Sequence, residues 1–276
     1  GVLLGGLLTE YLSWRWVLFV NVPIAVGAVL LAPRLVPESR DEREQGGFDL
    51  DGAFTVTAGL AVLIYALVDA NDAGWGSTQT IVLLALAAAL LVSFVVVESR
   101  AAAPLVPFDV FRSRTRTGAY ATGLLVGASL FSMFFFVSLY MQQVLGWDAL
   151  KSGLAYLPLA ITIILAAGIA SVLVTKIGFK PVVITGLLSV AAGLFLFSRI
   201  SADGSFGGDI LIPSLLAAVG LGFSFVPVTI GGTTGIAPDE AGLASGLINA
   251  GQQVGGALGL AILAALATAR TEAVST

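Results

Sequence analysis

The sequence predicts an all-α membrane protein that crosses the bilayer eight times. Of its 276 residues, 57% are hydrophobic and 11% are charged, and the mean hydropathy is +0.99. A soluble domain of this length could not bury so much apolar surface, so lipid must cover the outside. A spanning helix needs about 20 mostly apolar residues. The stretches that meet this requirement are 16–34, 53–70, 79–98, 117–141, 153–175, 181–198, 210–231 and 242–269.

The absence of Cys and His excludes several kinds of chemistry. Without them there is no disulfide framework, no thiolate or imidazole metal site, and no Ser-His or Cys nucleophile. No basic block suggests a nucleic-acid partner. We therefore expect no catalytic residue, no metal ligand and no cofactor, and the sequence does not predict an enzyme.

The positive charges of the loops predict the orientation. Successive loops lie on alternating sides of the membrane. The set of loops that begins at Arg34 holds nine of the 13 Lys and Arg residues, and the set on the other side holds four. Cytoplasmic loops carry the excess of positive charge in membrane proteins. The loops that we expect in the cytoplasm are 35–52, 99–116, 176–180 and 232–241.

The opening of the chain and the ends of several spans carry local signals. The apolar opening 1–8 is typical of the end of a preceding helix, so we interpret the chain as a fragment. Asp49 and Asp51 precede the span 53–70 and suit a helix start, where a carboxylate accepts from free backbone N–H groups. We interpret Asp69 and Glu98, at span ends, as interfacial residues rather than proton carriers, and Asp209 in the same way.

The span 117–141 contains a cluster of phenylalanines that includes Phe134. Such a cluster usually faces lipid or packs in the core. Tyr140 and Gln143 follow it, and an apolar wall with a few polar groups suits an amphipathic ligand. Both interpretations stay open at this point, as does an aromatic interfacial belt for Trp75, Trp147 and Tyr140.

The span 210–231 combines Gly220, Gly222 and Pro227 with two aromatic residues. Glycines and a proline inside a span indicate a kinked or closely packed helix. Phe223 and Phe225 lie beside them in the sequence.

The span 242–269 has two sets of glycines at four-residue spacing, which gives a flat strip where another backbone can approach closely. Its amide side chains would be costly if they faced lipid, so we expect them to face a neighbouring helix or a wet cavity. The glycines are Gly242 and Gly246, then Gly251, Gly255 and Gly259; the amides belong to Asn249, Gln252 and Gln253. The opening stretch repeats the theme with Gly1, Gly5 and Gly6.

Four sequence phrases, in this order, resemble the fourteen-helix drug:proton antiporters (EmrB/QacA type) of the major facilitator superfamily. The first is WRWVLFVNVP at residues 14–23, and the second is FDLDG at 48–52. The third consists of MQQVLGW (141–147), SGL (152–154) and LP (157–158). The fourth consists of AGLASG (241–246), Asn249 and QQVGGALG (252–259). The chain departs from the family at Val2, where the antiporter motif has a proline. The loop 176–181 resembles a degenerate copy of the superfamily's cytoplasmic loop and lacks its acidic residue.

The resemblance implies an incomplete transporter fold, with the end of helix five followed by helices six to thirteen. The early helices, which carry the family's proton-handling acid, and helix fourteen are not in this chain. The implied parts are 1–34 (end of the N-terminal bundle), 35–52 (cytoplasmic linker), 53–98 (inserted helix pair), 99–116 (cytoplasmic loop) and 117–276 (C-terminal bundle lacking its last helix).

The resemblance further implies a multi-pass protein of the bacterial cytoplasmic membrane that exports small amphipathic or hydrophobic compounds as a monomer. The proton gradient would drive export while two bundles rock about a central site. We expect substrate contact from Phe134, Tyr140, Gln143, Phe223 and Phe225. We expect a bundle-interface or gating role for Gly1, Gly5, Gly6, Asn249, Gly251, Gln252, Gln253, Gly255 and Gly259.

Other interpretations remain. A non-transporting truncated remnant, or a uniporter or symporter for another small solute, would have the same spans. A membrane enzyme or sensor would need a nucleophile with its base, a metal site or a soluble domain, and the loops are too short for a domain.

Overall fold

The computed structural model describes residues 2–35, 49–101, 104–236 and 241–275, and in these ranges the regular structure is helical. Eight helical segments are long and apolar enough to cross a membrane, which confirms the eight predicted spans. They are Arg15–Leu35, Leu50–Ala70, Thr78–Glu98, Arg114–Val144, Ala149–Ile177, Phe179–Phe197, Phe206–Thr233 and Gly242–Thr271. Of the loops predicted to be cytoplasmic, residues 36–48, 102–103 and 237–240 lie outside the described residues.

The chain folds into two compact units. Unit 1 comprises residues 1–42 and 134–226, and unit 2 comprises residues 43–133 and 227–276. Helices α6 (Arg114–Leu139) and α10 (Ile212–Thr233) contribute to both units. The predicted domain boundaries follow the family's bundles and stay a prediction.

Unit 1 contains most of the short helices. The first predicted span is divided into α2 (Arg15–Phe19) and α3 (Asn21–Leu35). The span predicted at 153–175 consists of α7 (Ala149–Ala155) followed by α8 (Leu157–Ile177), so it begins four residues earlier than predicted. The remaining elements of this unit are α1 (Val2–Tyr11), the π-helical turns η2 (Tyr140–Val144) and η3 (Phe206–Leu211), and α9 (Phe179–Phe197).

Glycines allow α9 and α10 to pack closely inside unit 1. A Cβ on Gly220 would lie 2.5 Å from the Val190 nitrogen, and a Cβ on Gly193 would lie 2.8 Å from the Pro213 carbonyl oxygen. A Cβ on Gly222 would meet α8 in the same way, 2.6 Å from the Ala166 Cβ. The close packing predicted for the span 210–231 is therefore confirmed.

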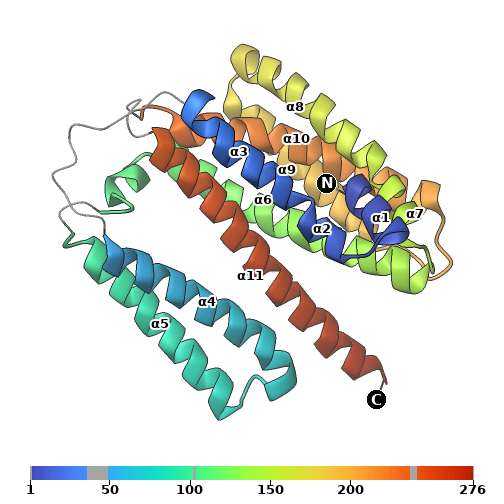
Figure 1. The fold of residues 1–276 in the computed structure, drawn as a ribbon, viewed down its shortest axis with the longest axis horizontal. Coiled ribbons are helices and arrows are strands. Elements are labelled where there is room, and N and C mark those ends of the chain that lie inside the picture. Colours follow the sequence, from blue (N-terminus) through green and yellow to red (C-terminus); the bar gives the residue numbers. More distant parts are fainter. Residues whose placement is uncertain (1, 36–48, 102–103, 237–240, 276) are drawn as a thin grey trace. The chain divides into compact units, whose positions relative to one another are not determined.

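In unit 2, α4 (Leu50–Ala73) and α5 (Thr78–Glu98) lie side by side as a hairpin (Figure 1). Small residues at the contact permit this: a Cβ on Gly59 would lie 2.9 Å from Leu91 Cδ2, and Ala66 and Ala87 are fully buried. Asp49 caps α4 by accepting a 2.7 Å hydrogen bond from the Gly52 N–H, which confirms the predicted helix start.

The rest of unit 2 packs around a small apolar cluster. The 3-10 turn η1 (Phe108–Arg112), the first part of α6, the end of α10 and α11 (Ala241–Ser275) surround it. Its buried members are Val110, Tyr120, Val228 and Ile248, and the Tyr120 hydroxyl donates a 3.0 Å hydrogen bond to the Gly232 carbonyl.

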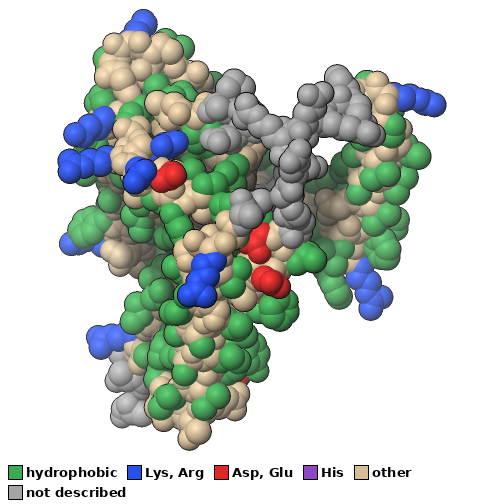
Figure 2. Space-filling model, turned by 90° about the vertical axis from the view of Figure 1, so that its left-hand side faces the viewer, with side chains coloured by type: hydrophobic (Ala, Val, Ile, Leu, Met, Phe, Trp, Pro, Cys, Tyr) green, Lys and Arg blue, Asp and Glu red, His purple; other side chains and the backbone are tan. Residues whose placement is uncertain are grey.

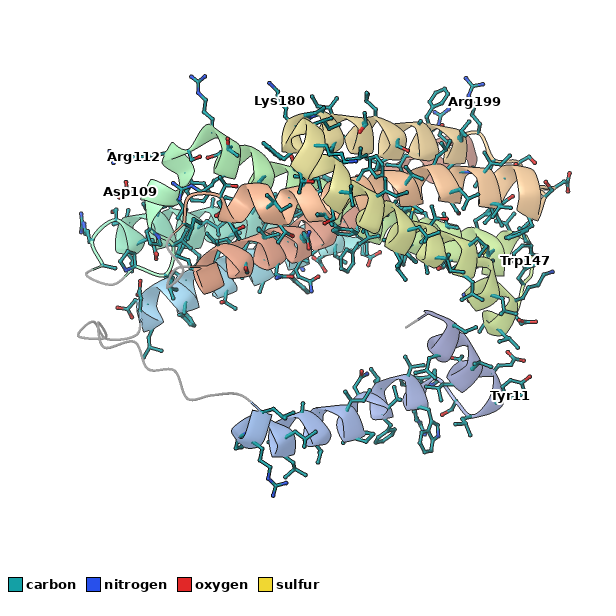
Figure 3. The ribbon with its side chains drawn as sticks, turned by 90° about the horizontal axis from the view of Figure 1, so that it is seen from above. Tyr11, Asp109, Arg112, Trp147, Lys180 and Arg199 are labelled. Carbon is teal, nitrogen blue, oxygen red and sulfur yellow. The ribbon has the colours of Figure 1, made fainter. Side chains whose placement is uncertain are left out.

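The surfaces of the helices are largely apolar. Figure 2 shows hydrophobic side chains over much of the visible face, with charges confined to a few places. Ile164 of α8 and Leu188 of α9 are 70% and 65% exposed, as expected of side chains that face lipid. Lys180 and Arg199 stand at opposite ends of α9 (Figure 3), so the charges border this span on both sides.

Candidate substrate cavity and helix contacts

Tyr140 lies where α6 changes into the π-helical turn η2. Its side chain is 8% exposed, and its hydroxyl donates a 2.7 Å hydrogen bond to the Ser201 carbonyl in the loop after α9. Single-turn π segments occur frequently at functional sites. This hydrogen bond ties the Tyr140 hydroxyl to the loop after α9, so only the ring would be available to a substrate. Substrate contact by Tyr140 stays a prediction.

Phe134 stacks on Tyr156, with ring centroids 4.8 Å apart and an interplanar angle of 27°. The Tyr156 hydroxyl donates a 3.0 Å hydrogen bond to the Phe134 carbonyl and lies 3.0 Å from the Ser138 hydroxyl. A buried tyrosine usually finds such partners. Tyr156, which the sequence analysis did not select, thus fixes the ring that we expect to contact substrate.

A pocket of about 230 Å³, lined in equal measure by polar and apolar surface, lies among α1, the end of α6 and α7 within unit 1. The Ser152 hydroxyl is buried at this pocket without a hydrogen-bond partner among the described residues. Here α1 packs closely against α7, since a Cβ on Gly6 would lie 2.8 Å from the Ala149 carbonyl oxygen. The lining residues are Gly5, Gly6, Thr9, Ser138, Gln142, Ala149, Ser152, Gly153 and Tyr156.

Two of the predicted interface glycines therefore lie at a pocket whose lining is half polar and half apolar. Gly1, the third glycine of that motif, lies outside the described residues. The gating role of all three stays a prediction.

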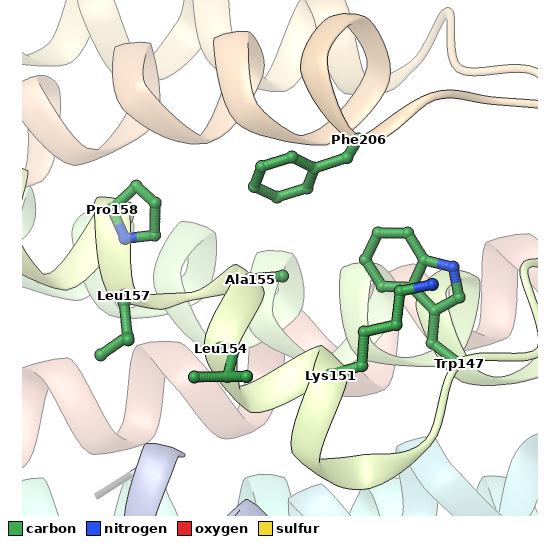
Figure 4. Close-up of a pocket in the computed structure, with 7 residues that line it drawn as sticks. All are labelled: Trp147, Lys151, Leu154, Ala155, Leu157, Pro158 and Phe206. Atoms are coloured by element: carbon green, nitrogen blue, oxygen red, sulfur yellow. The ribbon is translucent and has the colours of Figure 1, made fainter.

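A second pocket in unit 1, of about 590 Å³, is mostly apolar. The Lys151 ammonium lies 4.3 Å from the centre of the Trp147 ring, and the Phe206 ring is 6.2 Å from that ring (Figure 4). Two aromatic rings with one cation beside them suit the boundary between lipid and water. The interpretation of Trp147 as an interfacial residue stays a prediction.

The glycine strip of α11 packs against α6 within unit 2. The Leu124 carbonyl occupies the space that a Cβ on Gly255 would need, and the Gln252 carbonyl occupies the corresponding space at Gly127. One turn further along, a Cβ on Gly259 would lie 2.5 Å from the Ala128 Cβ. The close backbone approach expected of these glycines is present, with α6 as the neighbour, while their gating role stays a prediction.

The other predicted residues of α11 differ in their surroundings. Gly251 is not closely packed: a Cβ there would lie 3.9 Å from the Tyr120 carbonyl oxygen, which is an ordinary contact distance. The Asn249 amide donates a 3.0 Å hydrogen bond to the Ser245 carbonyl in its own helix and is exposed, as is Gln253. Gln252 is half-buried, and its Cγ lies 3.8 Å from the Cβ position of Gly123.

The three remaining predicted cavity residues are more open. Gln143 is exposed in η2, whereas Phe223 and Phe225 are half-buried in α10. The Phe223 Cβ lies 3.0 Å from the Cβ position of Gly186 in α9. Substrate contact by these residues stays a prediction.

Comparison with known proteins identifies the family. The sequence profile described as "Major Facilitator Superfamily" matches residues 1–260. The chain belongs to the major facilitator superfamily. This superfamily membership confirms the predicted all-α transporter fold and points to a transporter rather than an enzyme.

Curated relatives of this superfamily protein match almost all of its residues. It is 37% identical to the puromycin resistance protein pur8 of Streptomyces alboniger, over 99% of this chain and 54% of the relative. It is 39% identical to the cephamycin export protein CmcT of Amycolatopsis lactamdurans, over 95% of this chain and 55% of the relative. It is 33% identical to the multidrug transporter protein MdtP of Bacillus subtilis, over 98% and 50%. The chain spans about half the length of these curated relatives.

Proposed function

We propose that the full-length protein exports small hydrophobic or amphipathic compounds from the cell, coupled to the inward movement of protons. The observation that carries this proposal is the similarity, over 95% or more of the chain, to relatives named for antibiotic export, antibiotic resistance and multidrug transport. The proposal places the protein in the bacterial cytoplasmic membrane, as a multi-pass monomer with the loops 35–52, 99–116, 176–180 and 232–241 inside.

Transport would follow the rocking of two bundles about a cavity near the midplane of the bilayer. Phe134, Tyr140, Gln143, Phe223 and Phe225 are the proposed substrate contacts. Aromatic rings with few polar groups suit amphipathic ligands, and the stacked pair of Phe134 and Tyr156 supports a rigid apolar wall.

An efflux assay tests this proposal. Everted membrane vesicles that contain the full-length protein should accumulate a fluorescent amphipathic dye when a proton gradient is imposed, and a protonophore should abolish accumulation. Vesicles without the protein are the control. If accumulation is unchanged after the gradient collapses, proton coupling is wrong, and if no dye, puromycin or other small amphipathic compound is moved, export is wrong.

A further inference from the structure

The pocket of about 230 Å³ among α1, the end of α6 and α7 contains a hydroxyl group that the fold leaves without a partner. Ser152 is only 3% exposed, and its hydroxyl makes no hydrogen bond to any described residue. Its backbone N–H, by contrast, donates to the Asp148 carbonyl at 3.1 Å. A buried hydroxyl without a partner costs free energy, and a ligand that bonds to it removes that cost.

Ser138 offers an acceptor at the same pocket. The Tyr156 hydroxyl donates its single proton to the Phe134 carbonyl at 3.0 Å, so the Ser138 hydroxyl, 3.0 Å away, is the donor in their contact. The Ser138 oxygen then keeps lone pairs that can accept a further hydrogen bond. Gln142 adds an amide to the lining, and an amide both donates and accepts.

The side chains in the described lining of this pocket are all neutral. The charged residues next to Ser152 are engaged elsewhere: the Lys151 ammonium lies 4.3 Å from the centre of the Trp147 ring, and Asp148 Oδ1 accepts a 2.6 Å hydrogen bond from the Lys151 N–H. An ion would therefore enter the pocket without a countercharge, at a high desolvation cost. A neutral group that both donates and accepts, such as a hydroxyl or an amide, matches the lining.

The volume limits the ligand to a small group. A water molecule takes about 30 Å³ of liquid, and pockets for drug-sized ligands have about 300–1,000 Å³. A pocket of about 230 Å³ therefore accepts one end of such a compound. Because α1 and α7 are in backbone contact at Gly6 and Ala149, the pocket cannot widen between these helices without breaking that packing.

We propose that this pocket binds the neutral hydroxyl or amide end of the exported compound, and that Ser152 selects for that end. The Ser152 hydroxyl has no hydrogen bond to lose, so its rotation about χ1 toward a ligand breaks none. Tyr156 connects the pocket to the proposed substrate wall, because it lines the pocket and stacks on Phe134. The inference rests on the proposed export and names the chemical class of compound that would be preferred.

Binding of two matched dyes to the purified full-length protein tests the proposal. The probes are a diethylaminocoumarin with a neutral hydroxyethyl arm and the same dye with a propyl arm, so one arm ends in a hydroxyl and the other in a methyl group. Fluorescence titration gives a dissociation constant for each dye. The preference for the hydroxyethyl dye should fall about tenfold in Ser152→Ala relative to the wild type. Because the same two dyes are compared in each protein, their different solubility in detergent cancels.

Ser132→Ala is the matched control. Ser132 is also 3% exposed and its hydroxyl also lacks a partner in the described part of the chain, but it does not belong to the described lining of this pocket. Its dye preference should equal that of the wild type. A preference that stays unchanged in Ser152→Ala, or that falls equally in Ser132→Ala, would overturn the proposal. An unchanged preference with an altered melting temperature in Ser152→Ala would assign the hydroxyl to a buried water instead.

Thiol labelling gives a second readout that needs no dye. In a full-length protein without other Cys, Ser152→Cys should react faster with neutral hydroxyethyl methanethiosulfonate than with the cationic aminoethyl or the anionic sulfonatoethyl reagent. Each rate is divided by the rate at the exposed position Ser99→Cys, which removes differences in intrinsic reactivity. Equal normalised rates for the three reagents would contradict a pocket for neutral groups.

The two proposals fail in different ways. If both dyes are bound and exported, and wild type and Ser152→Ala do not differ in their preference, this inference is wrong and the proposed export stands. If the wild type neither binds nor moves either dye, the inference is wrong together with the proposed export.

Discussion

Gly255 of α11 faces Leu124 of α6 so closely that the Leu124 carbonyl occupies the space of a Cβ at position 255. In a membrane, where lipid is as apolar as the helices, such close backbone contact supplies much of the attraction between helices. The contact determines which substitutions this part of unit 2 can accept.

Gly255→Ala should destabilise the protein, because the added methyl group forces α6 and α11 apart. Overpacking of this kind costs about 1–3 kcal/mol, which intrinsic tryptophan fluorescence during heating in detergent would report as a lower melting temperature. Gly246→Ala is the matched control: it lies in the same helix with open space around its Cβ position. Equal melting temperatures for the two variants would contradict the close contact.

Tyr140→Phe should lower stability by about 1 kcal/mol, because it removes the hydrogen bond to the Ser201 carbonyl. Tyr65→Phe serves as control, since Tyr65 is 55% exposed on α4. Thermal unfolding at one pH compares the two. A Tyr140→Phe protein as stable as wild type would show that the loop after α9 is not held by this bond.

Ser138 and Tyr156 should show coupled effects on stability. The two hydroxyl groups lie 3.0 Å apart, so Ser138→Ala and Tyr156→Phe remove the same hydrogen bond. In a double-mutant cycle the combined variant should lose less stability than the sum of the single variants, by about 0.5–1.5 kcal/mol. Strict additivity would mean that the hydroxyl groups do not interact.

Phe223→Ala and Tyr140→Ala should change which dyes are exported while membrane expression stays normal, because both side chains are proposed to contact substrate. Phe54→Ala is the control, since Phe54 is 69% exposed in the proposed peripheral helix pair. Efflux rates for a panel of amphipathic dyes measure the profile. Unchanged profiles for both Phe223→Ala and Tyr140→Ala would show that the cavity assignment is wrong.

These 276 residues contain no Cys, so cysteines introduced into them test the orientation once any Cys elsewhere in the full-length protein is replaced. A single cysteine at Ala202, exposed in the loop between α9 and η3, should react with an impermeant thiol reagent in intact cells. A cysteine at Ser99, exposed after α5, should react only after permeabilisation. The gel shift that a mass tag causes in the full-length protein measures the labelling of each cysteine. The opposite labelling pattern would show that the predicted orientation is wrong.

The sequence by itself determined the spans, the helix start at Asp49 and the superfamily. These depend on local properties: about 20 apolar residues cross a bilayer wherever they pack, and a carboxylate before a helix accepts from its free N–H groups. The four-residue glycine spacing of α11 likewise predicted a close neighbour, because the spacing places the glycines on one face.

Tertiary structure decided which neighbours those residues have. Gly246 and Gly255 share the same spacing pattern, yet only Gly255 meets a backbone, since α6 reaches that turn of α11 and leaves Gly246 open. Tyr156 was not selected and Glu98 was interpreted as an interfacial residue, although a tyrosine or a carboxylate in apolar surroundings needs partners. Their partners are distant in sequence or lie in another helix. Only the fold could bring Glu98 to Asp49, 49 residues earlier, so that Asp49 Oδ2 and Glu98 Oε2 would lie 2.5 Å and 3.0 Å from a Cβ on Gly52.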